Sequence, residues 1–293
     1  MQPQRIPIHA NKVLAAILLF LAVLLALPAL AVNNNIDETQ TFALESITDI
    51  RVSASSTRVH IISAPVGSEV RFRLYGDAPK KIWLESSQQG SVLTVTEARE
   101  ATITFAQEHM NLDVYLPINY AQSLAADTSS GELSLDALTL DRLSAGSSSG
   151  EIKLAPLTAR AVSLVSTSGG VTAESITADS LTIEATSGQV SVQALTARDA
   201  AVTATSADMS LTYAAFGGDA LTIRSTSGQV ALALPADASF GFAISRTSSY
   251  VQSDFEEIAA FGQEPDTLRG KVNGGEGSVN IACTSGDIEI SKR

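Results

Sequence analysis

Apolar and polar residues alternate with a period of two around a short motif that recurs through the second half of the chain. The motif reads Thr-Ser-Gly in its clearest copies. Its last position is occupied by Gly131, Gly150, Gly169, Gly188, Ala207, Gly228, Ser249 and Gly286. The first four intervals between these positions are 19 residues, the next two are 21 and the last is 37. Such regularity indicates an array of structural repeats.

The columns around the motif predict which side chains are buried. Apolar residues recur seven and five positions before the last motif residue, and two and four positions after it. Around Gly169 these residues are Val162, Leu164, Val171 and Ala173. A weaker column seven positions after the motif holds Leu138, Leu157, Ile176 and Leu195. The residues between the columns are mostly polar, as in a strand with one buried and one solvated face.

The pattern predicts an all-β fold, a β-solenoid (β-helix-like) of about 19-residue coils. Each coil is expected to hold a strand, a Thr-Ser-Gly corner, a second short strand and a weaker third face or loop. One coil cannot bury its apolar face alone, so like columns stack on like columns. We expect the corner glycines to supply a φ above 0°, which costs energy for residues with a Cβ. Ala207 and Ser249 depart from glycine, which predicts less regular corners there.

Residues 36–120 alternate in the same way but lack the 19-residue period. They predict an N-terminal β cap region, made of a sheet or of irregular first coils, ahead of the repeat solenoid at 121–293. A cap is needed because a bare terminal coil exposes a sheet edge. The C-terminal coil has less obvious cover, and we expect Lys292 and Arg293 to deter edge pairing there.

The period breaks between Ser249 and Gly286. Within this interval, Gly270–Val272 is interpreted as a degenerate coil. Residues 252–266 form an excursion whose apolar residues have near-helical spacing. These residues are Phe255, Ile258 and Phe261. The stretch 252–268 is therefore a candidate for a flap that covers part of the rod.

The N-terminus is typical of an export signal. A basic start at 1–12 precedes an apolar run, Val13–Leu27, and a small-x-small site at Ala29–Ala31. Together these parts predict a secretory signal peptide at 1–31. The alternative is an uncleaved membrane anchor at 13–32, because about 20 apolar residues suffice to span a bilayer. Either interpretation predicts an exported protein that is periplasmic, cell-surface or secreted.

Composition narrows the classes of function. The 293 residues include 19 Lys and Arg and 31 Asp and Glu, for a net charge of −12. Without a basic excess to neutralise phosphates, no nucleic-acid partner is expected. A single Cys excludes an intramolecular disulfide framework. Hydrophobic residues make up 45% of the chain, which argues against disorder.

Few residues are candidates for chemistry, and each has a structural interpretation that we prefer. Gly146–Gly150 matches the G-x-S-x-G nucleophile elbow but lies in the repeat register, as a solenoid corner would. His60 and His109 lack the spacing of metal ligands and are expected to be structural. Gly274–Gly277 is expected to form a turn rather than a calcium-binding repeat. Cys283 occupies a column of small residues, which predicts a tucked side chain rather than a reactive thiol.

Two successive coils are expected to stack acidic side chains. Glu132 and Glu151 follow successive motifs, so their repulsion calls for Lys153 or a weakly bound calcium ion, and a solvated face with Lys153 is preferred. Trp83 and the five tyrosines are too scattered in the sequence to predict an aromatic platform for a sugar. We therefore predict no catalytic, cofactor-binding or metal-binding residue, and no cofactor.

The repeat text resembles a known bacterial family. The resemblance rests on Thr-Ser-Gly-x-[Val/Ile]-x-[Val/Leu/Ile], on Leu116-Pro117 before the first repeat, and on Gly274–Gly277 before Cys283–Ile288. These residues are similar to the exported putative-adhesin family, β-strand-repeat proteins classed as a domain of unknown function. The likeness covers residues 38–292. It implies an extracytoplasmic β-solenoid in a bacterial envelope and supplies no catalytic residue.

Export, repeats and the lack of a catalytic constellation predict a non-enzymatic, adhesin-like envelope protein. Its solenoid would present a repeat surface to an envelope glycan, a protein partner or a second copy of the chain. One alternative is a polysaccharide-active β-helix enzyme that uses Arg246, Arg269 and Lys271 near the irregular segment, an analogy of fold alone. A second alternative is the ectodomain of a membrane-anchored regulator, which requires the uncleaved anchor.

Overall fold

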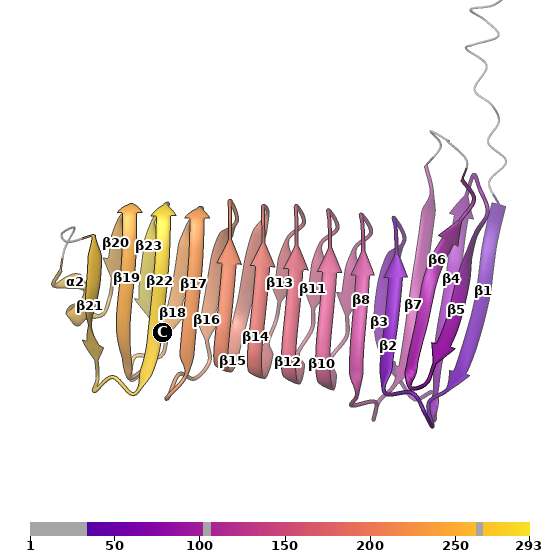
Figure 1. Cartoon of the computed structure of the whole chain (residues 1–293), viewed down its shortest axis with the longest axis horizontal. Coiled ribbons are helices and arrows are strands. Elements are labelled where there is room, and N and C mark those ends of the chain that lie inside the picture. Colours follow the sequence, from indigo (N-terminus) through magenta and orange to yellow (C-terminus); the bar gives the residue numbers. More distant parts are fainter. Residues whose placement is uncertain (1–33, 102–106, 262–265) are drawn as a thin grey trace, which may run out of the picture.

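Alternating residues of successive coils pair in register and build a long rod (Figure 1). This computed structural model describes residues 34–101, 107–261 and 266–293. The signal peptide expected at 1–31 and the alternative anchor at 13–32 lie outside the described residues. The predicted all-β solenoid is confirmed, because strands from successive coils form two long ladders.

The first long face of the rod takes one strand from each coil. Its inner strands are parallel, and its outermost strand at each end is antiparallel to its neighbour. From the N-terminal end, this face consists of β5 (Ile82–Gln89), β6 (Val92–Arg99), β2 (Asp49–Ala54), β8 (Ser123–Thr128), β10 (Leu138–Ser147), β12 (Leu157–Ser166), β14 (Ile176–Ala185), the second part of β15 (Gln189–Ala204), β17 (Ala220–Ser227), β22 (Gly277–Ser285), β19 (Phe240–Ser248) and β21 (Thr267–Val272).

The second long face takes the strands on the other side of the corners. Its first two pairings, at the N-terminal end, are antiparallel, and the others are parallel. In spatial order it consists of β1 (Asn34–Ala43), β4 (Glu69–Ala78), β7 (His109–Pro117), β3 (Arg58–Ala64), β9 (Leu133–Leu135), β11 (Ile152–Leu154), β13 (Val171–Ala173), the first part of β15, β16 (Asp208–Tyr213), β18 (Val230–Leu234), β23 (Ile288–Lys292) and β20 (Val251–Ser253).

The core lies between the two faces and runs the length of the rod. On the first face, Leu143 pairs with Leu124 on one side and with Val162 on the other. On the second face, Ile152 pairs with Leu133. All five side chains are buried, as the apolar columns predicted. Because each column continues into the next coil, every coil covers apolar surface of its neighbours. This burial stabilises the fold by about 25 cal/mol for each Å² of apolar surface removed from water.

The weaker column forms a short third face, which is made by the first residues of β10, β12 and β14 and by the middle of β15. Its residues pair successively and are buried: Leu138, Leu157, Ile176 and Leu195. In the next coil Tyr213, which is fully buried, lies beside Leu195. The column ends there.

The first coil of the sequence lies inside the rod rather than at its end. β2 is held between β6 and β8, and β3 between β7 and β9. Ile50 accordingly pairs with both Leu93 and Leu124. The segment 36–120 thus supplies a coil in register with the repeats as well as the strands outside it. Figure 1 shows β1, β4 and β5 closing this end of the rod.

The last coil of the sequence is internal as well. β22 lies between β17 and β19, and β23 lies between β18 and β20. The expectation that Lys292 and Arg293 protect an exposed edge is therefore wrong, because β23 has a partner on both sides. The Lys292 Nζ lies 5.0 Å from the centre of the Phe255 ring instead.

The excursion after β20 covers the C-terminal end of the rod. Its near-helical residues form helix α2 (Glu256–Ala259), from which Ile258 is buried. Phe255 is also buried and packs edge-on against Phe240, with ring centres 5.5 Å apart. The rest of the candidate flap, 252–268, includes residues outside the described ranges. Within those ranges, no helix is both long and apolar enough to cross a membrane.

The interpretation of Gly270–Val272 as a degenerate coil is wrong. These residues belong to β21, which runs antiparallel to β19. A Cβ on Gly270 would lie 2.6 Å from the Phe242 ring, so the close packing of this edge strand requires a glycine. The antiparallel direction ends the parallel ladder of the first face.

The corner glycines are needed chiefly because neighbouring corners approach closely. A Cβ on Gly169 would overlap the carbonyl oxygen of Gly150, and a Cβ on Gly150 would overlap that of Gly131. The corner glycines with a positive φ are Gly188, Gly228 and Gly286. The expectation that every corner glycine supplies a positive φ is therefore wrong for the first three corners, where steric crowding excludes other residues.

Candidate functional site

The corners of the 19-residue repeats hydrogen-bond to one another in one direction along the rod, whereas the Gly228 N–H donates the other way, to the Ser285 carbonyl at 3.3 Å. The Ser149 N–H donates to the Ser129 carbonyl, and the Ser168 N–H donates to the Ser148 carbonyl, both at 2.8 Å. Each of these corners therefore directs N–H groups toward its N-terminal neighbour and carbonyls toward its C-terminal neighbour. Buried backbone groups need hydrogen-bond partners. The N–H groups at the N-terminal end of the stack therefore require an acceptor from elsewhere, and the carbonyls at the C-terminal end require a donor.

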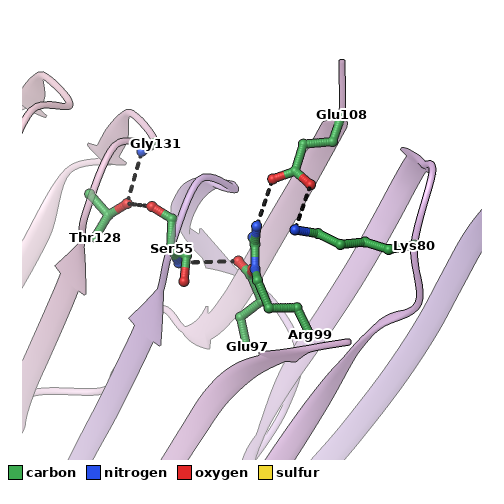
Figure 2. Close-up of polar contacts among 7 residues, drawn as sticks. All are labelled: Ser55, Lys80, Glu97, Arg99, Glu108, Thr128 and Gly131. Atoms are coloured by element: carbon green, nitrogen blue, oxygen red, sulfur yellow. Dashed lines mark hydrogen bonds and ion pairs between the residues drawn. The ribbon is translucent and has the colours of Figure 1, made fainter. Parts of the chain in front are cut away.

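At the N-terminal end, Glu97 provides the acceptor. Its Oε2 accepts the backbone N–H of Ser55 at 3.3 Å, and its side chain has no exposed surface. The Arg99 guanidinium pairs with this carboxylate and also donates from Nη1 to Glu108 at 2.7 Å. Lys80 Nζ lies 3.7 Å from the same Glu108 (Figure 2). Two acids and two bases thus form a neutral cluster, and pairing makes a buried carboxylate tolerable.

At the C-terminal end, Arg246 provides a donor. Its Nη1 donates to the carbonyl of Ser249 at 3.0 Å, and the Ser249 hydroxyl donates to the Cys283 carbonyl at 3.4 Å. Arg246 therefore stabilises the last corner. The other basic residues of the enzyme alternative, Arg269 and Lys271, are exposed on β21, the outermost strand of the first face.

The structure places the candidate nucleophile elbow at a solenoid corner. Within Gly146–Gly150, Ser147 is buried and the next two serines turn between β10 and β11. His60 Nε2 lies 3.0 Å from Asp136 Oδ1, and His60 is paired in register with Asp113 rather than with His109. Among the residues that the structure describes, no three metal-ligating side chains come together.

Cys283 is tucked into its column. Its side chain is buried, and Sγ lies 3.5 Å from the Gly286 carbonyl, to which it donates. Ser166 makes the same contact with Gly169 at 2.6 Å. The Cys283 column is therefore a position for a small side chain that hydrogen-bonds within its own corner.

The turn expected at Gly274–Gly277 connects β21 to β22, and its last residue, Gly277, begins β22. The Ser239 hydroxyl oxygen accepts the backbone N–H groups of Gly275 and Glu276, each at 3.1 Å. Gly274 and Gly275 both have positive φ, at 99° and 80°, which a glycine adopts without a Cβ penalty.

The stacked carboxylates share one lysine. Lys153 Nζ lies 2.7 Å from Glu132 and 3.1 Å from Glu151. The hydrogen bond to Glu132, followed by that to Glu151, raises the pKa of Lys153. The predicted solvated face with Lys153 between the two acids is what the structure shows.

Aromatic and basic residues that are distant in sequence gather on the outer surface of β4 and β7. The guanidinium of Arg71 lies 4.7 Å from the centre of the Tyr115 ring, and that of Arg73 lies 4.8 Å from the Tyr75 ring. Asp113 is paired in register with Arg73 and accepts the Tyr115 hydroxyl at 3.1 Å. We call Arg71, Arg73, Tyr75, Asp113 and Tyr115 the Tyr–Arg patch.

Tyr75 and Tyr115 are far apart in the sequence but lie on one surface. In the antiparallel pairing of β4 with β7, Tyr75 is opposite Asn111 and Tyr115 is opposite Arg71, so Arg73 and Asp113 lie between the two tyrosines. Sequence spacing contains no sign of that pairing. The only local signal is that both residues occupy outward positions of alternating strands. Partial burial, followed by Asp113, raises the pKa of both hydroxyls, so the two rings stay neutral at physiological pH.

The patch continues into a polar column along the second face. Successive members are paired in register on neighbouring strands, about 4.8 Å apart. In order they are Asp113, His60, Ser134, Lys153, Thr172, Ser191 and Ser210. The rod therefore offers a regular series of hydrogen-bonding groups along one surface.

Two parallel faces, stacked corners and capped ends define the class of the protein, an all-β solenoid. The sequence model of the Toastrack DUF4097 family matches residues 47–291, and the chain belongs to this family. The match confirms the resemblance to β-strand-repeat proteins of unknown function.

The chain is similar to several solved structures at low sequence identity. A putative adhesin from Parabacteroides distasonis is 12% identical, with a TM-score of 0.50 over 88% of this chain and 98% of that chain. A putative adhesin from Parabacteroides merdae is 14% identical, with a TM-score of 0.48 over 87% and 95%. A protein described as a putative lipid binding protein from Parabacteroides distasonis is 13% identical, with a TM-score of 0.49 over 88% and 98%. No curated protein matches the chain.

Proposed function

We propose that this protein is a non-enzymatic, adhesin-like component of a bacterial envelope, whose rod presents its outer surface to a glycan or protein partner. The Tyr–Arg patch is the observation that carries this proposal. Tyr and Arg supply much of the binding energy at recognition surfaces, because they offer large planar groups with hydrogen-bonding ends. A position outside the cytoplasm is supported by the apolar segment 13–32, which directly precedes β1 in the sequence.

The patch is arranged for contact before a partner arrives. Arg71 stacks on Tyr115, and Asp113 accepts the hydroxyl of the same ring. Fixing these side chains in advance reduces the conformational entropy that binding would otherwise cost. The strands beneath the patch belong to the continuous ladder of the second face.

Co-sedimentation tests this function. The chain without residues 1–31 would be mixed with isolated envelope material, before and after protease treatment of that material. We expect pelleting, and we expect the double variant Arg71→Ala, Tyr115→Ala to lower the affinity about tenfold or more. Arg198→Ala, an exposed arginine on the first face, is the matched control and should bind like the wild type.

Each result has a stated meaning. Pelleting that survives protease treatment supports a glycan partner, and pelleting lost on treatment supports a protein partner. If the patch variant pellets like the wild type, the patch has no role in binding. If nothing pellets, the adhesin-like function is wrong. Protein-dependent release of reducing ends from an acidic polysaccharide would overturn the non-enzymatic part and favour the enzyme alternative.

A further inference from the structure

The outer surface of the first face carries a depression outside the Tyr–Arg patch. It has a volume of about 570 Å³ and crosses β2, β8, β10, β12 and β14. A column of small residues paired in register lines its floor: Ala125, Ser144 and Ser163. Arg142 and Asp127 stand on either side of this column. The volume lies within the range of about 300–1,000 Å³ found for ligand sites.

Asp127 also borders a second depression of about 450 Å³, which reaches the corner at Ser148 and includes Val165. In the ladder Asp127 is paired with Gly146, and a Cβ on Gly146 would overlap the Asp127 Oδ1. The carboxylate therefore occupies the space that the missing side chain leaves. This position puts one acidic group at the junction of two adjoining depressions.

The Asp127 carboxylate has unused hydrogen-bonding capacity. Among the described residues, none forms a hydrogen bond or ion pair with it. Although solvent reaches the side chain, the surrounding walls partly desolvate the carboxylate, and this burial raises its pKa. A carboxylate can accept several hydrogen bonds, and the exposed Asp127 carboxylate is accessible to the hydroxyl donors of a ligand.

The other lining groups match the chemistry of sugars. The Arg142 side chain is 63% exposed and offers donors on the wall opposite Asp127. Ser144 and Ser163 both donate and accept along the floor. Val165, which lines the adjoining second depression, is 43% exposed and offers an apolar surface for C–H groups. Hydroxyl donors, acceptors and C–H faces occur together in a polysaccharide chain.

The charge of the depression selects among polysaccharides. Its lining contains two acids, Asp49 and Asp127, and two bases, Arg51 and Arg142, so the depression carries no net charge. Arg51 pairs with Asp49 at 2.7 Å, while Asp141, which lies 3.5 Å from Arg142, is held more closely by Arg160 at 2.7 Å. A surface without net charge offers no net attraction to a polyanion, which favours an uncharged chain.

We propose that this depression is a glycan-binding site for a short stretch of an uncharged polysaccharide, with Asp127 accepting hydrogen bonds from sugar hydroxyls. The inference rests on the proposed function in one respect, namely that the rod meets envelope material. It adds a second site, remote in sequence from the Tyr–Arg patch, and it names the class of ligand.

The test uses protein-free polysaccharide extracted from the envelope and separated by anion exchange into neutral and acidic fractions. Binding of the full chain to each fraction would be measured by titration. We expect the neutral fraction to bind, and we expect Asp127→Asn to weaken that binding about tenfold or more. Ser144→Trp, which fills the floor from an exposed position, should do the same.

Glu184→Gln is the matched control. Glu184 is exposed and lies outside both depressions. It belongs to the same outward column as Asp127, because Asp127, Gly146, Val165 and Glu184 are paired in register on successive strands. The substitution removes the same charge as Asp127→Asn, but from a position outside the depressions, so it should leave binding unchanged. Thermal melting of each variant would show that the fold is intact before binding is compared.

The outcomes separate this inference from the proposed function. Neutral polysaccharide that binds equally to wild type, Asp127→Asn and Ser144→Trp overturns the site but leaves an adhesin-like function standing. Failure to bind the neutral fraction, with protease-sensitive binding to whole envelope, also overturns the site while supporting a protein partner. Tighter binding to the acidic fraction, or to an amine-bearing chitosan oligomer, overturns the assignment to an uncharged chain.

Discussion

The Glu97 carboxylate accepts the backbone N–H of Ser55 at 3.3 Å, and this contact terminates the stack of corners. In the next corner the equivalent N–H, that of Ser129, donates to the Ala54 carbonyl at 3.2 Å. A side chain at the end of the rod thus replaces a backbone carbonyl. Thr57 occupies the position of this corner that a glycine fills in the later corners. In those corners, a Cβ would overlap the carbonyl of the corner on the N-terminal side. Thr57 is in the first corner of the stack, so its Cβ is accommodated.

Replacing Glu97 with Ala should destabilise the N-terminal end of the rod. The change leaves the Ser55 N–H without its acceptor and removes one partner of Arg99, so we expect a loss of about 3 kcal/mol. Glu97→Gln keeps an acceptor and should cost less. Urea unfolding measures the free energies, with Glu100→Ala as the control because Glu100 is exposed nearby. Equal losses for Glu97→Ala and Glu100→Ala would contradict the capping role.

Two adjacent glycines should respond differently to the same substitution. A Cβ on Gly169 would overlap the Gly150 carbonyl, whereas a Cβ on Gly170 would meet its nearest neighbour, the Gln189 carbonyl oxygen, at 3.5 Å. We expect Gly169→Ala to cost about 2 kcal/mol or more from overpacking and Gly170→Ala to be close to neutral. Thermal melting checks this, and similar melting temperatures for the two variants would argue against the crowded corner.

The same reasoning applies where crowding and backbone conformation coincide. Gly188 has a φ of 102°, and its Cβ would come within 2.6 Å of the Gly169 carbonyl oxygen. Gly188→Val should therefore lower the melting temperature far more than Gln189→Val, since Gln189 is exposed in an outward strand position. Equal melting temperatures would show that this corner tolerates a side chain.

Cys283 should be unreactive in the folded protein and replaceable by serine. Its Sγ is buried and donates to the Gly286 carbonyl. In another corner, the Ser166 hydroxyl donates to the Gly169 carbonyl in the same way. Cys283→Ser should change the free energy of unfolding by less than about 1 kcal/mol. A thiol reagent should react only after denaturant is added. Rapid labelling of the native protein, or a dimer that disappears on reduction, would contradict a tucked thiol.

Asp127 should make stability depend on pH with a defined sign. Burial raises its pKa above the ordinary value of 3.8, so the folded state favours the protonated form. As the pH rises through the pKa of the folded state, Asp127 ionises and the folded protein loses stability relative to the unfolded chain. An asparagine does not ionise, so it avoids this loss. Asp127→Asn should melt slightly higher than the wild type at about pH 7 and equally at about pH 3. A variant that melts lower at neutral pH would indicate a stabilising partner for this carboxylate.

The amino-acid sequence by itself determined the register of the coils. Leu124, Leu143 and Val162 recur at one place in each repeat, and they stack in that order because like columns bury one another. The pairing of Asp127 with Gly146 follows from the same 19-residue spacing, so this part of the proposed glycan site could be predicted from the sequence. The period also placed the corners. It did not show that, at Gly131, Gly150 and Gly169, a Cβ is excluded by the carbonyl of the neighbouring corner rather than by a positive φ.

Only the tertiary structure decided which coil neighbours which at the two ends. The coil of β2 and β3 lies inside that of β6 and β7, and the coil of β22 and β23 lies inside that of β19 and β20. Antiparallel pairing of β4 with β7 likewise put Tyr75 and Tyr115 on one surface, on either side of Arg73 and Asp113. The physical reason is that every coil presents similar apolar columns, so local periodicity establishes that coils stack. Their order depends on contacts between residues far apart in the chain, which a local pattern does not contain.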